Sequence, residues 1–288
     1  MGSAGSGLAD PEFVRLGEAL QRRHRMQGRL RRTAATVACA VPAVRERVPA
    51  LADLPQLTVT CSDSVGGDRM AAKYDGARSG VPRRLAVSVL ALPGSPEDYL
   101  RGRSKQALRT NSRRAREAGV TCRRMGRVEA EVRIAALLRA RDEEELLPGV
   151  RTDLVDGVVQ AWVARDADDA TEVIALTSVD GTFARLDLML SAPDREAGPA
   201  RYLLSAHLVG ELIERGVRHL AVDTALWLDA GLRHFQRLLG FEPMTLEFRR
   251  GPAVGTLPDD GPFPAPRISS GPLPVPAVVG AGAAGTAS

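Results

Sequence analysis

Apolar and polar positions divide this chain into a patterned middle and two ends without a pattern. Short apolar runs alternate with helix-like repeats between residues 55 and 250, whereas residues 1–11 are small and polar. Residues 251–288 are mostly Gly, Pro, Ala and Val and show no period. The pattern predicts one folded region between disordered ends. Residues 12–54 form a separate segment, which we expect to be an arginine-rich helical extension.

Within the folded region, the spacing of apolar residues predicts alternating strands and helices. Strands are expected at 57–61, 69–74, 83–92, 120–124, 172–179, 182–191, 218–222 and 241–248. Helices are expected at 95–119, 128–147, 154–166, 199–215 and 229–239. Asp180-Gly181 indicates a hairpin, and the strand–helix–strand unit from Leu186 to Val222 favours a parallel crossover. The predicted fold class is therefore α/β, a mixed sheet with helices on its faces.

Composition narrows the class of protein. The chain is 44% hydrophobic and has no run near the ~20 apolar residues of a membrane span, so we expect a cytoplasmic protein without a membrane partner. Three cysteines without a Cys-x-x-Cys pair, and only four histidines, predict no metal site. Residues 1–127 carry a net charge of +13 and residues 128–288 a net charge of −9. The basic half suits phosphates or nucleic acid, and the acidic half suits amines.

One short segment carries the clearest chemistry. In SAPDREAGPARYLLSAH, residues 191–207, a predicted strand gives way to a helix through Arg195-x-x-Gly198-x-Ala200. The first N–H groups of a helix have no partner inside it, and together with the helix dipole they favour an anion. Gly198 lets the backbone approach a ligand, Ala200 and Arg201 are expected to offer free N–H groups, and Arg195 adds charge. The arrangement suits a pyrophosphate.

This segment resembles the coenzyme A pyrophosphate loop of the GNAT superfamily of acyl-CoA N-acyltransferases. FQRLLGFEP, residues 235–243, is similar to the last helix and strand of that family. The resemblance covers 120–250 as a core and extends to about 55. It implies a GNAT-like fold, acetyl-CoA or another acyl-CoA as co-substrate, and a small-molecule or peptide amine as acceptor. The coenzyme contacts that it implies are Met189, Leu190, Ser191, Arg195, Ala197, Gly198, Ala200, Arg201 and Phe235.

The candidate catalytic residues are two carboxylates and a histidine. Asp187, in the strand before the motif, and Asp223, at the end of the next strand, are alternative general bases for the acceptor amine. Asp187 could instead form an ion pair with Arg185, and Asp223 could serve a turn. His234 is a candidate to protonate the leaving thiolate or else a surface residue. Gln236 stands where the family usually has its tyrosine acid, which leaves the acid step open.

Two alternatives belong to other classes. YLRGRSKQALRTNSRRAREAGV, residues 99–120, resembles the Fem family, which transfers amino acids from tRNA, and a related group of acetyltransferases named for cellulose biosynthesis. In that case Lys105, Arg109 and Arg113 would contact tRNA or another polyanion. The third hypothesis is a binding protein that has lost its catalytic acid. The chain is expected to be a monomer or a homodimer.

Overall fold

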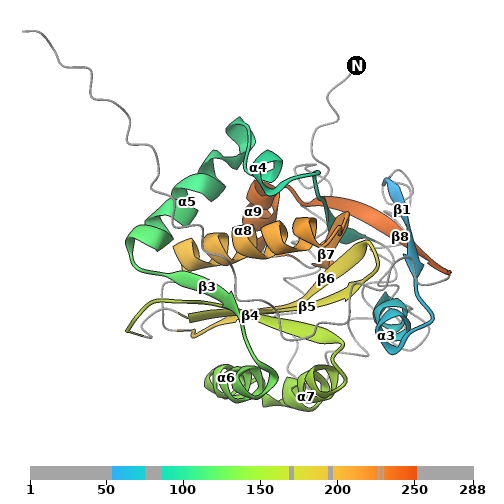
Figure 1. Ribbon diagram of the computed structural model, residues 1–288, viewed down its shortest axis with the longest axis horizontal. Helices are drawn as coiled ribbons and strands as arrows, with labels where there is room; N and C mark the ends of the chain where they lie inside the picture. Colours follow the sequence, from blue (N-terminus) through green and yellow to red (C-terminus); the bar gives the residue numbers. More distant parts are fainter. Residues whose placement is uncertain are drawn as a thin grey trace, which may run out of the picture. The chain divides into compact units, whose positions relative to one another are not determined.

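An eight-stranded mixed sheet forms the centre of the part of the chain that the computed structural model describes (Figure 1). The described residues are 54–74, 86–168, 172–193, 197–225, 228 and 230–251. The strands are β1 (Gln56–Cys61), β2 (Val87–Ala91), β3 (Thr121–Arg124), β4 (Val159–Arg165), β5 (Glu172–Asp180), β6 (Phe183–Ser191), β7 (His219–Thr224) and β8 (Glu242–Arg250). Their spatial order is β1-β8-β2-β7-β6-β5-β4-β3.

The sheet pairs are parallel at two places and antiparallel elsewhere. β1 runs parallel to β8, and β6 runs parallel to β7. The pairs β2–β7, β2–β8, β3–β4, β4–β5 and β5–β6 are antiparallel. The predicted mixed sheet and the parallel crossover through the helix after β6 are therefore confirmed.

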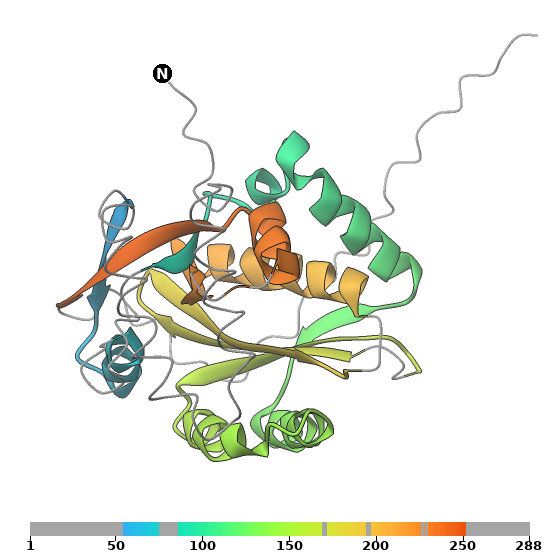
Figure 2. The same ribbon diagram turned by 180° about the vertical axis from the view of Figure 1, so that it is seen from behind.

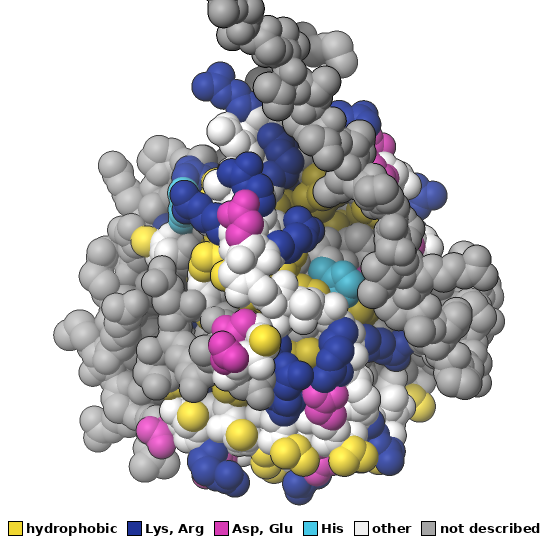
Figure 3. Space-filling model, turned by 60° about the vertical axis from the view of Figure 1, so that its left-hand side comes forward, with side chains coloured by type: hydrophobic (Ala, Val, Ile, Leu, Met, Phe, Trp, Pro, Cys, Tyr) yellow, Lys and Arg dark blue, Asp and Glu magenta, His cyan; other side chains and the backbone are white. Residues whose placement is uncertain are grey.

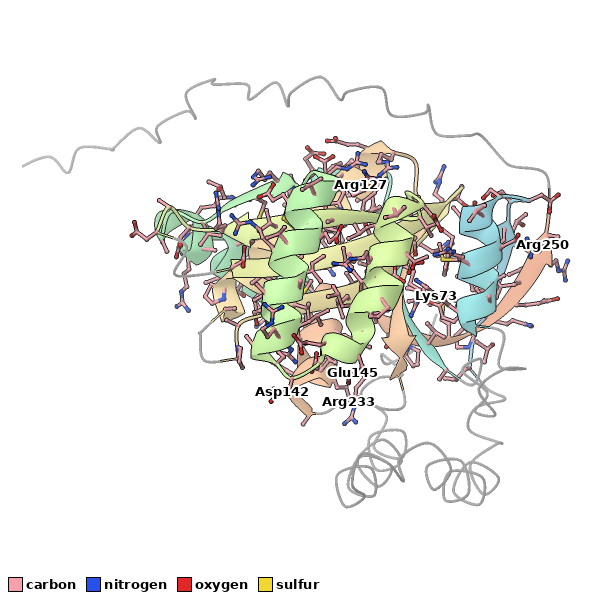
Figure 4. All side chains as sticks on the ribbon, turned by 90° about the horizontal axis from the view of Figure 1, so that it is seen from below. Lys73, Arg127, Asp142, Glu145, Arg233 and Arg250 are labelled. Atoms are coloured by element: carbon pink, nitrogen blue, oxygen red, sulfur yellow. The ribbon has the colours of Figure 1, made fainter. Side chains whose placement is uncertain are left out.

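Helices cover both faces of the sheet. They are α3 (Val65–Tyr74), α4 (Pro96–Tyr99), α5 (Gln106–Glu117), α6 (Arg127–Ala140), α7 (Leu147–Val155), α8 (Gly198–Glu214) and α9 (Ala230–Leu239), with 3-10 turns η4 (Arg103–Lys105) and η5 (Glu144–Leu146). α5, α8 and α9 lie on one face, and α6 and α7 lie on the other (Figures 1 and 2). Seen from the second face, α6 and α7 run side by side with α3 next to α7 (Figure 4).

Three buried apolar clusters correspond to this layering. The largest includes Leu108 of α5, Leu204 and Leu208 of α8, and Leu220 of β7. A second joins α6 and α7 to β4 and β5, and a third lies under α3 beside β1, β2 and β8. Each helix thus buries one stripe against a sheet face, which is the stable solution for a sheet with two apolar faces.

Two predicted elements are wrong in type. Residues 69–74 were expected as a strand but belong to α3, because Met70 and Tyr74, four residues apart, are both buried on one helix face. Gly66-Gly67 is typical of a turn and was expected to form one, but Gly67 lies in α3, where a Cβ would collide with the Ser62 carbonyl oxygen. The helix expected at 154–166 is instead the end of α7 followed by β4. β4 is covered on both faces, so its sequence is mostly apolar without strict alternation and resembles a buried helix.

Two other predicted helices are interrupted. The helix expected at 95–119 divides into α4, η4 and α5, with Gly102 at a φ of 90° between α4 and η4. The helix expected at 128–147 ends at Ala140, and Asp142 follows at a φ of 53°. Pro148 lies in the first turn of α7, where the missing N–H is harmless, and so it begins a helix instead of ending one. The hairpin at Asp180-Gly181 is confirmed, with Gly181 at a φ of 55°.

The terminal segments were assigned from the sequence alone. The predicted disorder at 1–11 lies outside the described residues, and so do nearly all of the extension at 12–54 and the tail at 251–288. These assignments stay predictions.

Candidate active site

The sheet opens between β6 and β7. The two parallel strands pair over only three positions in the part of the chain described here, from Phe183 opposite His219 to Arg185 opposite Ala221. β6 nevertheless continues to Ser191 and β7 to Thr224. Beyond Arg185, the edge of β6 that faces β7 therefore has no strand partner among the described residues, and its backbone amides can bond to a ligand.

A β-bulge marks the start of this opening. β5 and β6 pair regularly on both sides, but Leu176 opposes Leu188 and Thr177 opposes Leu186, so Asp187 is the extra residue. The bulge changes which way the later side chains point. Leu186 and Met189 pack with the cluster on the α8 side, whereas Leu188 packs with the cluster on the α6 side. Bulges of this kind redirect side chains and are frequent next to active sites.

A cavity of about 240 Å³ lies in the opening. Its lining comes from β6, α8, β7, α9 and the residues that flank α9. The residues are Leu186, Asp187, Leu188, Met189, Ser205, Leu208, Val209, Leu220, Val222, Leu228, Leu232, Phe235, Gln236, Leu239 and Phe241. Among these described lining residues, only Asp187, Ser205 and Gln236 are polar. A mostly apolar cavity with a few polar groups is the usual form of a small-molecule site.

The Asp187 carboxylate connects the cavity to α3. Its Oδ1 accepts hydrogen bonds from Arg185 Nη1 at 2.8 Å and from Lys73 Nζ at 2.5 Å. Lys73 also contacts Asp153 of α7, at 3.4 Å, and Figure 4 shows it between α3 and α7. Asp187 Oδ2 is buried and has no hydrogen-bond partner among the described residues. The expected pair with Arg185 is therefore present, and one oxygen remains for a substrate.

The start of α8 agrees in part with the predicted anion site. Gly198 is exposed, and a Cβ placed there would meet no atom within 4 Å, so a ligand has room to approach. No side chain of the described residues caps the helix. The expectation for Arg201 is wrong: its N–H donates to the Ala197 carbonyl at 3.0 Å, because it is the first residue able to make an intrahelical bond. Among the described residues, the N–H groups of Gly198 and Ala200, which precede this bond, have no acceptor.

Two arginines meet at the end of β6. Arg201 Nη2 donates to Ser191 Oγ at 2.6 Å, and Arg141, just after α6, donates from Nη1 to the Ser191 carbonyl at 3.4 Å. Burial, with the positive charge of Arg141 as a second cause, lowers the pKa of Arg201. Glu143 compensates Arg141, at 3.1 Å, and the described residues include no acidic partner of Arg201. Two like charges held together beside a helix start favour an anion between them.

The other predicted coenzyme contacts fall into three groups. Met189 and Phe235 line the cavity, and Phe235 packs edge to face against Tyr202 with ring centres 4.9 Å apart. Leu190, Ala197 and Ala200 are buried, with the Leu190 side chain on the α6 face, so only the backbone of Leu190 can border the opening. Arg195 lies outside the described residues. Asp223, the other candidate base, lies in β7, and its side chain lies outside the part of the chain that the structure describes.

His234 is exposed on α9 and does not line the cavity. Its Nδ1 lies 3.0 Å from Arg237 Nη2. The neighbouring Gln236 does line the cavity, is 5% exposed, and has a buried Oε1 without a partner among the described residues. The sequence identified Gln236 only as a departure from the family's tyrosine. Arg141 was missed; its signal was an arginine just before the turn at Asp142, which a helical interpretation of 128–147 concealed.

Two of the basic side chains expected to bind tRNA, in residues 99–120, form contacts within the protein instead. Lys105 donates to the Leu239 carbonyl at the end of α9 and lies 4.6 Å from the centre of the Tyr99 ring. Burial lowers the pKa of Lys105 to about 8. Arg109 donates to the Gly102 carbonyl at 2.8 Å. Arg113, by contrast, is exposed, and Figure 3 shows clusters of Lys and Arg side chains on this side of the molecule with scattered acidic ones.

Two further features concern only the described residues. They contain no group of three or more His, Cys, Asp or Glu side chains placed to hold a metal ion. None of their helices combines the length and the apolar character that crossing a bilayer requires.

Comparison with known proteins gives similarities of fold. No protein-family model and no curated protein matches the sequence. Among solved structures, FemX is 11% identical with a TM-score of 0.46, over 57% of this chain and 60% of that one. The C-terminal DUF2156 domain of a proposed lysylphosphatidylglycerol synthetase from Agrobacterium fabrum is 17% identical with a TM-score of 0.41, over 55% and 58%. A tandem GNAT protein from the clavulanic acid biosynthesis pathway is 16% identical with a TM-score of 0.36, over 77% and 69%.

The chain thus spans about three fifths of the length of the first two proteins. At these identities the likeness concerns the fold alone, and the chemistry has to be argued from the site of this chain.

Proposed function

We propose that this chain is an N-acyltransferase that moves an acyl group from a coenzyme A thioester to an amine by direct transfer. The observation that carries the proposal is the unpaired edge of β6 between two chemically different ends. The Asp187 bulge lies at one end, and Ser191 with Arg141 and Arg201 lies at the other. Ser191 follows Asp187 by four positions along the strand, a distance of roughly 13 Å.

Each part of this edge suits one part of the donor. Arg141, Arg201 and the free N–H groups at the start of α8 can bind the pyrophosphate. The unpaired backbone of β6 can exchange hydrogen bonds with the two amide groups of the pantetheine arm, as a strand edge does with an added peptide. The arm then delivers the thioester, which supplies an activated acyl group, to the cavity beside Asp187.

The residues around the cavity define the proton transfers. When the amine nitrogen forms its bond to the acyl carbon, Asp187 Oδ2 accepts the proton that the nitrogen loses. The carbon–sulfur bond breaks, and the thiolate leaves with its electron pair. The carboxamide of Gln236 is not an acid, so water at the mouth of the cavity protonates the thiolate, and the hydroxide that remains is neutralised by the proton that Asp187 gives up. Cys61 and Cys122 do not line the cavity, and burial raises the pKa of both thiols to about 12, which favours direct transfer over a cysteine-bound intermediate.

The test of the proposal is calorimetric titration with coenzyme A. Arg141→Gln and Arg201→Gln are each expected to weaken binding about tenfold, because each removes one charge-assisted hydrogen bond of ~1.5 kcal/mol. Arg249→Gln is the matched control, since Arg249 is an exposed arginine of β8 and contacts only Glu247 among the described residues. Wild-type affinity in both site variants, or no binding by the wild type, would overturn the proposal.

A second candidate function is transfer from aminoacyl-tRNA, and exposed arginines of α5 favour it. Arg113, Arg114 and Arg116 are all exposed, and Glu117 is the one acidic residue of that helix. Lys105 and Arg109 are bonded within the protein and are poor choices for a test. If α5 contacts phosphates, changing the three exposed arginines to glutamine should weaken tRNA binding on the order of 30-fold at low salt.

The salt dependence distinguishes true phosphate contacts from a general loss of charge. The slope of log affinity against log salt should become shallower by about three in the triple variant. Arg139 and Arg151, which pair with Glu144 and Glu131, supply a control double variant on the α6–α7 side. An unchanged slope would exclude α5 as the tRNA surface.

Should no amine in a broad panel release coenzyme A thiol, the chain would be a binding protein.

A further inference from the structure

We infer that the acyl group taken by this site is an uncharged chain of several carbons and not acetyl. The inference rests on the proposed function, because it concerns the acyl end of the same donor. It comes from the position, size and lining of the cavity between β6 and β7.

The cavity lies away from the anion-binding end of the site. Along α8 its lining begins at Ser205, seven residues or ~10 Å after Gly198, and continues to Val209. Along the sheet it extends past the Asp187 bulge to Leu186 and Leu220, next to the point where β6 and β7 begin to pair. The space therefore continues beyond the position that the reacting carbonyl would take beside Asp187.

This space is too large for one methyl group. Its volume is about 240 Å³. An apolar cavity of about 150 Å³ is large enough to bind benzene. Even with the end of the pantetheine arm inside, an acetyl group would leave much of the cavity without contacts. A chain of about six carbons would fill it.

The lining selects against charge. Leu208, Leu239 and Phe241 are buried to at least 96% and form much of the inner wall. The described residues around the cavity include no lysine, arginine or histidine, so the carboxylate of a dicarboxylic acyl group would be buried without a partner. Ser205 Oγ already donates to the Arg201 carbonyl at 2.8 Å.

An aminoacyl group fits less well than an aliphatic chain. Asp187 is the carboxylate that could attract its ammonium. The guanidinium of Arg185 and the ammonium of Lys73 already contact Asp187, and both come from the protein. A third cation beside them would be repelled. The remaining polar residue, Gln236, is neutral.

The experiment compares acyl-CoA esters by calorimetry in the absence of any amine. Coenzyme A itself, acetyl-, butyryl-, hexanoyl- and succinyl-CoA are titrated into the wild-type protein. Each of the four added methylenes should tighten binding about fourfold, so hexanoyl-CoA should bind roughly 250-fold more tightly than acetyl-CoA. Succinyl-CoA should bind no better than acetyl-CoA.

Two variants fill the cavity from facing walls. Val222→Phe acts from β7 and Val209→Phe from α8, and each should reduce the preference for hexanoyl-CoA over acetyl-CoA to about threefold. Val132→Phe adds the same bulk at an exposed valine of α6 that does not line the cavity, and it should keep the preference. Thermal unfolding shows which variants fold, and either phenylalanine variant suffices for the test.

The measurements test the inference on the acyl chain and the proposed function separately. Equal binding of acetyl- and hexanoyl-CoA, tighter binding of succinyl-CoA, or an unchanged preference in a phenylalanine variant that folds overturns the inference and leaves the transferase proposal standing. Failure of coenzyme A and of all its esters to bind overturns the proposed function.

Discussion

Replacing Asp187 by asparagine is expected to lower kcat for acyl transfer by about 10²- to 10⁴-fold, because the amide cannot accept the proton of the attacking amine. Asparagine keeps the shape of the side chain, and the anion-binding end of β6 lies roughly 13 Å away. The affinity for coenzyme A should therefore stay within about twofold of wild type, an order-of-magnitude expectation for a site that is not in contact. Release of coenzyme A thiol across an amine panel measures kcat, and calorimetry measures the affinity.

A folding defect has to be separated from a chemical one in this variant. The substitution would leave the buried guanidinium of Arg185 without its carboxylate, and removing one member of a buried pair costs several kcal/mol. Asp156→Asn is the control. Asp156, just after α7, pairs with Arg69 of α3 and does not line the cavity. Wild-type kcat in Asp187→Asn would exclude Asp187 as the base and direct attention to Asp223.

Gly198→Trp is expected to abolish coenzyme A binding, a loss of at least ~100-fold, without lowering the thermal stability. The space beside Gly198 is open, with no atom within 4 Å of a built Cβ, so a side chain can leave the backbone there without a clash at its first carbon. The same space is where the pyrophosphate would approach the N–H groups at the start of α8. Calorimetry with coenzyme A and a thermal unfolding curve give the two readouts.

Gly149→Trp provides the comparison for this variant. Gly149 is also exposed in the first turn of a helix, with no atom within 4 Å of a built Cβ, but it lies on α7 away from the opening of the sheet. It should bind coenzyme A as the wild type does. Binding by Gly198→Trp at wild-type affinity would show that no ligand occupies the start of α8.

The fold was predictable from the sequence wherever apolar spacing and a turn signal agree. The β5–β6 hairpin, α8, α9 and β8 combine a clear period with glycine or proline at the right place. β4 could not be recognised, because a strand covered on both faces has no alternation. α3 was mistaken because Gly67, which permits close packing against Ser62, also resembles a turn signal in the sequence. Tertiary packing decided both cases.

The site was predictable as a location and less so as a set of contacts. The Asp187 strand, the start of α8 and Phe235 of α9 come together at one opening, as the motif and its spacing suggest. The bulge at Asp187 depends on how β5 pairs with β6, which no local pattern in β6 reveals. Arg141 contacts Ser191, which lies 50 residues further along the chain, and this contact depends on the path of α6.

The position of β8 has a consequence for how this domain is completed during synthesis. β8 lies between β1 and β2, and its Leu246 is opposite Leu57 of β1. Chains emerge from the ribosome with the N-terminal part first, and contacts between distant segments form slowly. β1 therefore has an unpaired edge until nearly the whole domain has been translated. An exposed strand edge promotes aggregation, so we expect this edge to be a binding site for a chaperone on the nascent chain.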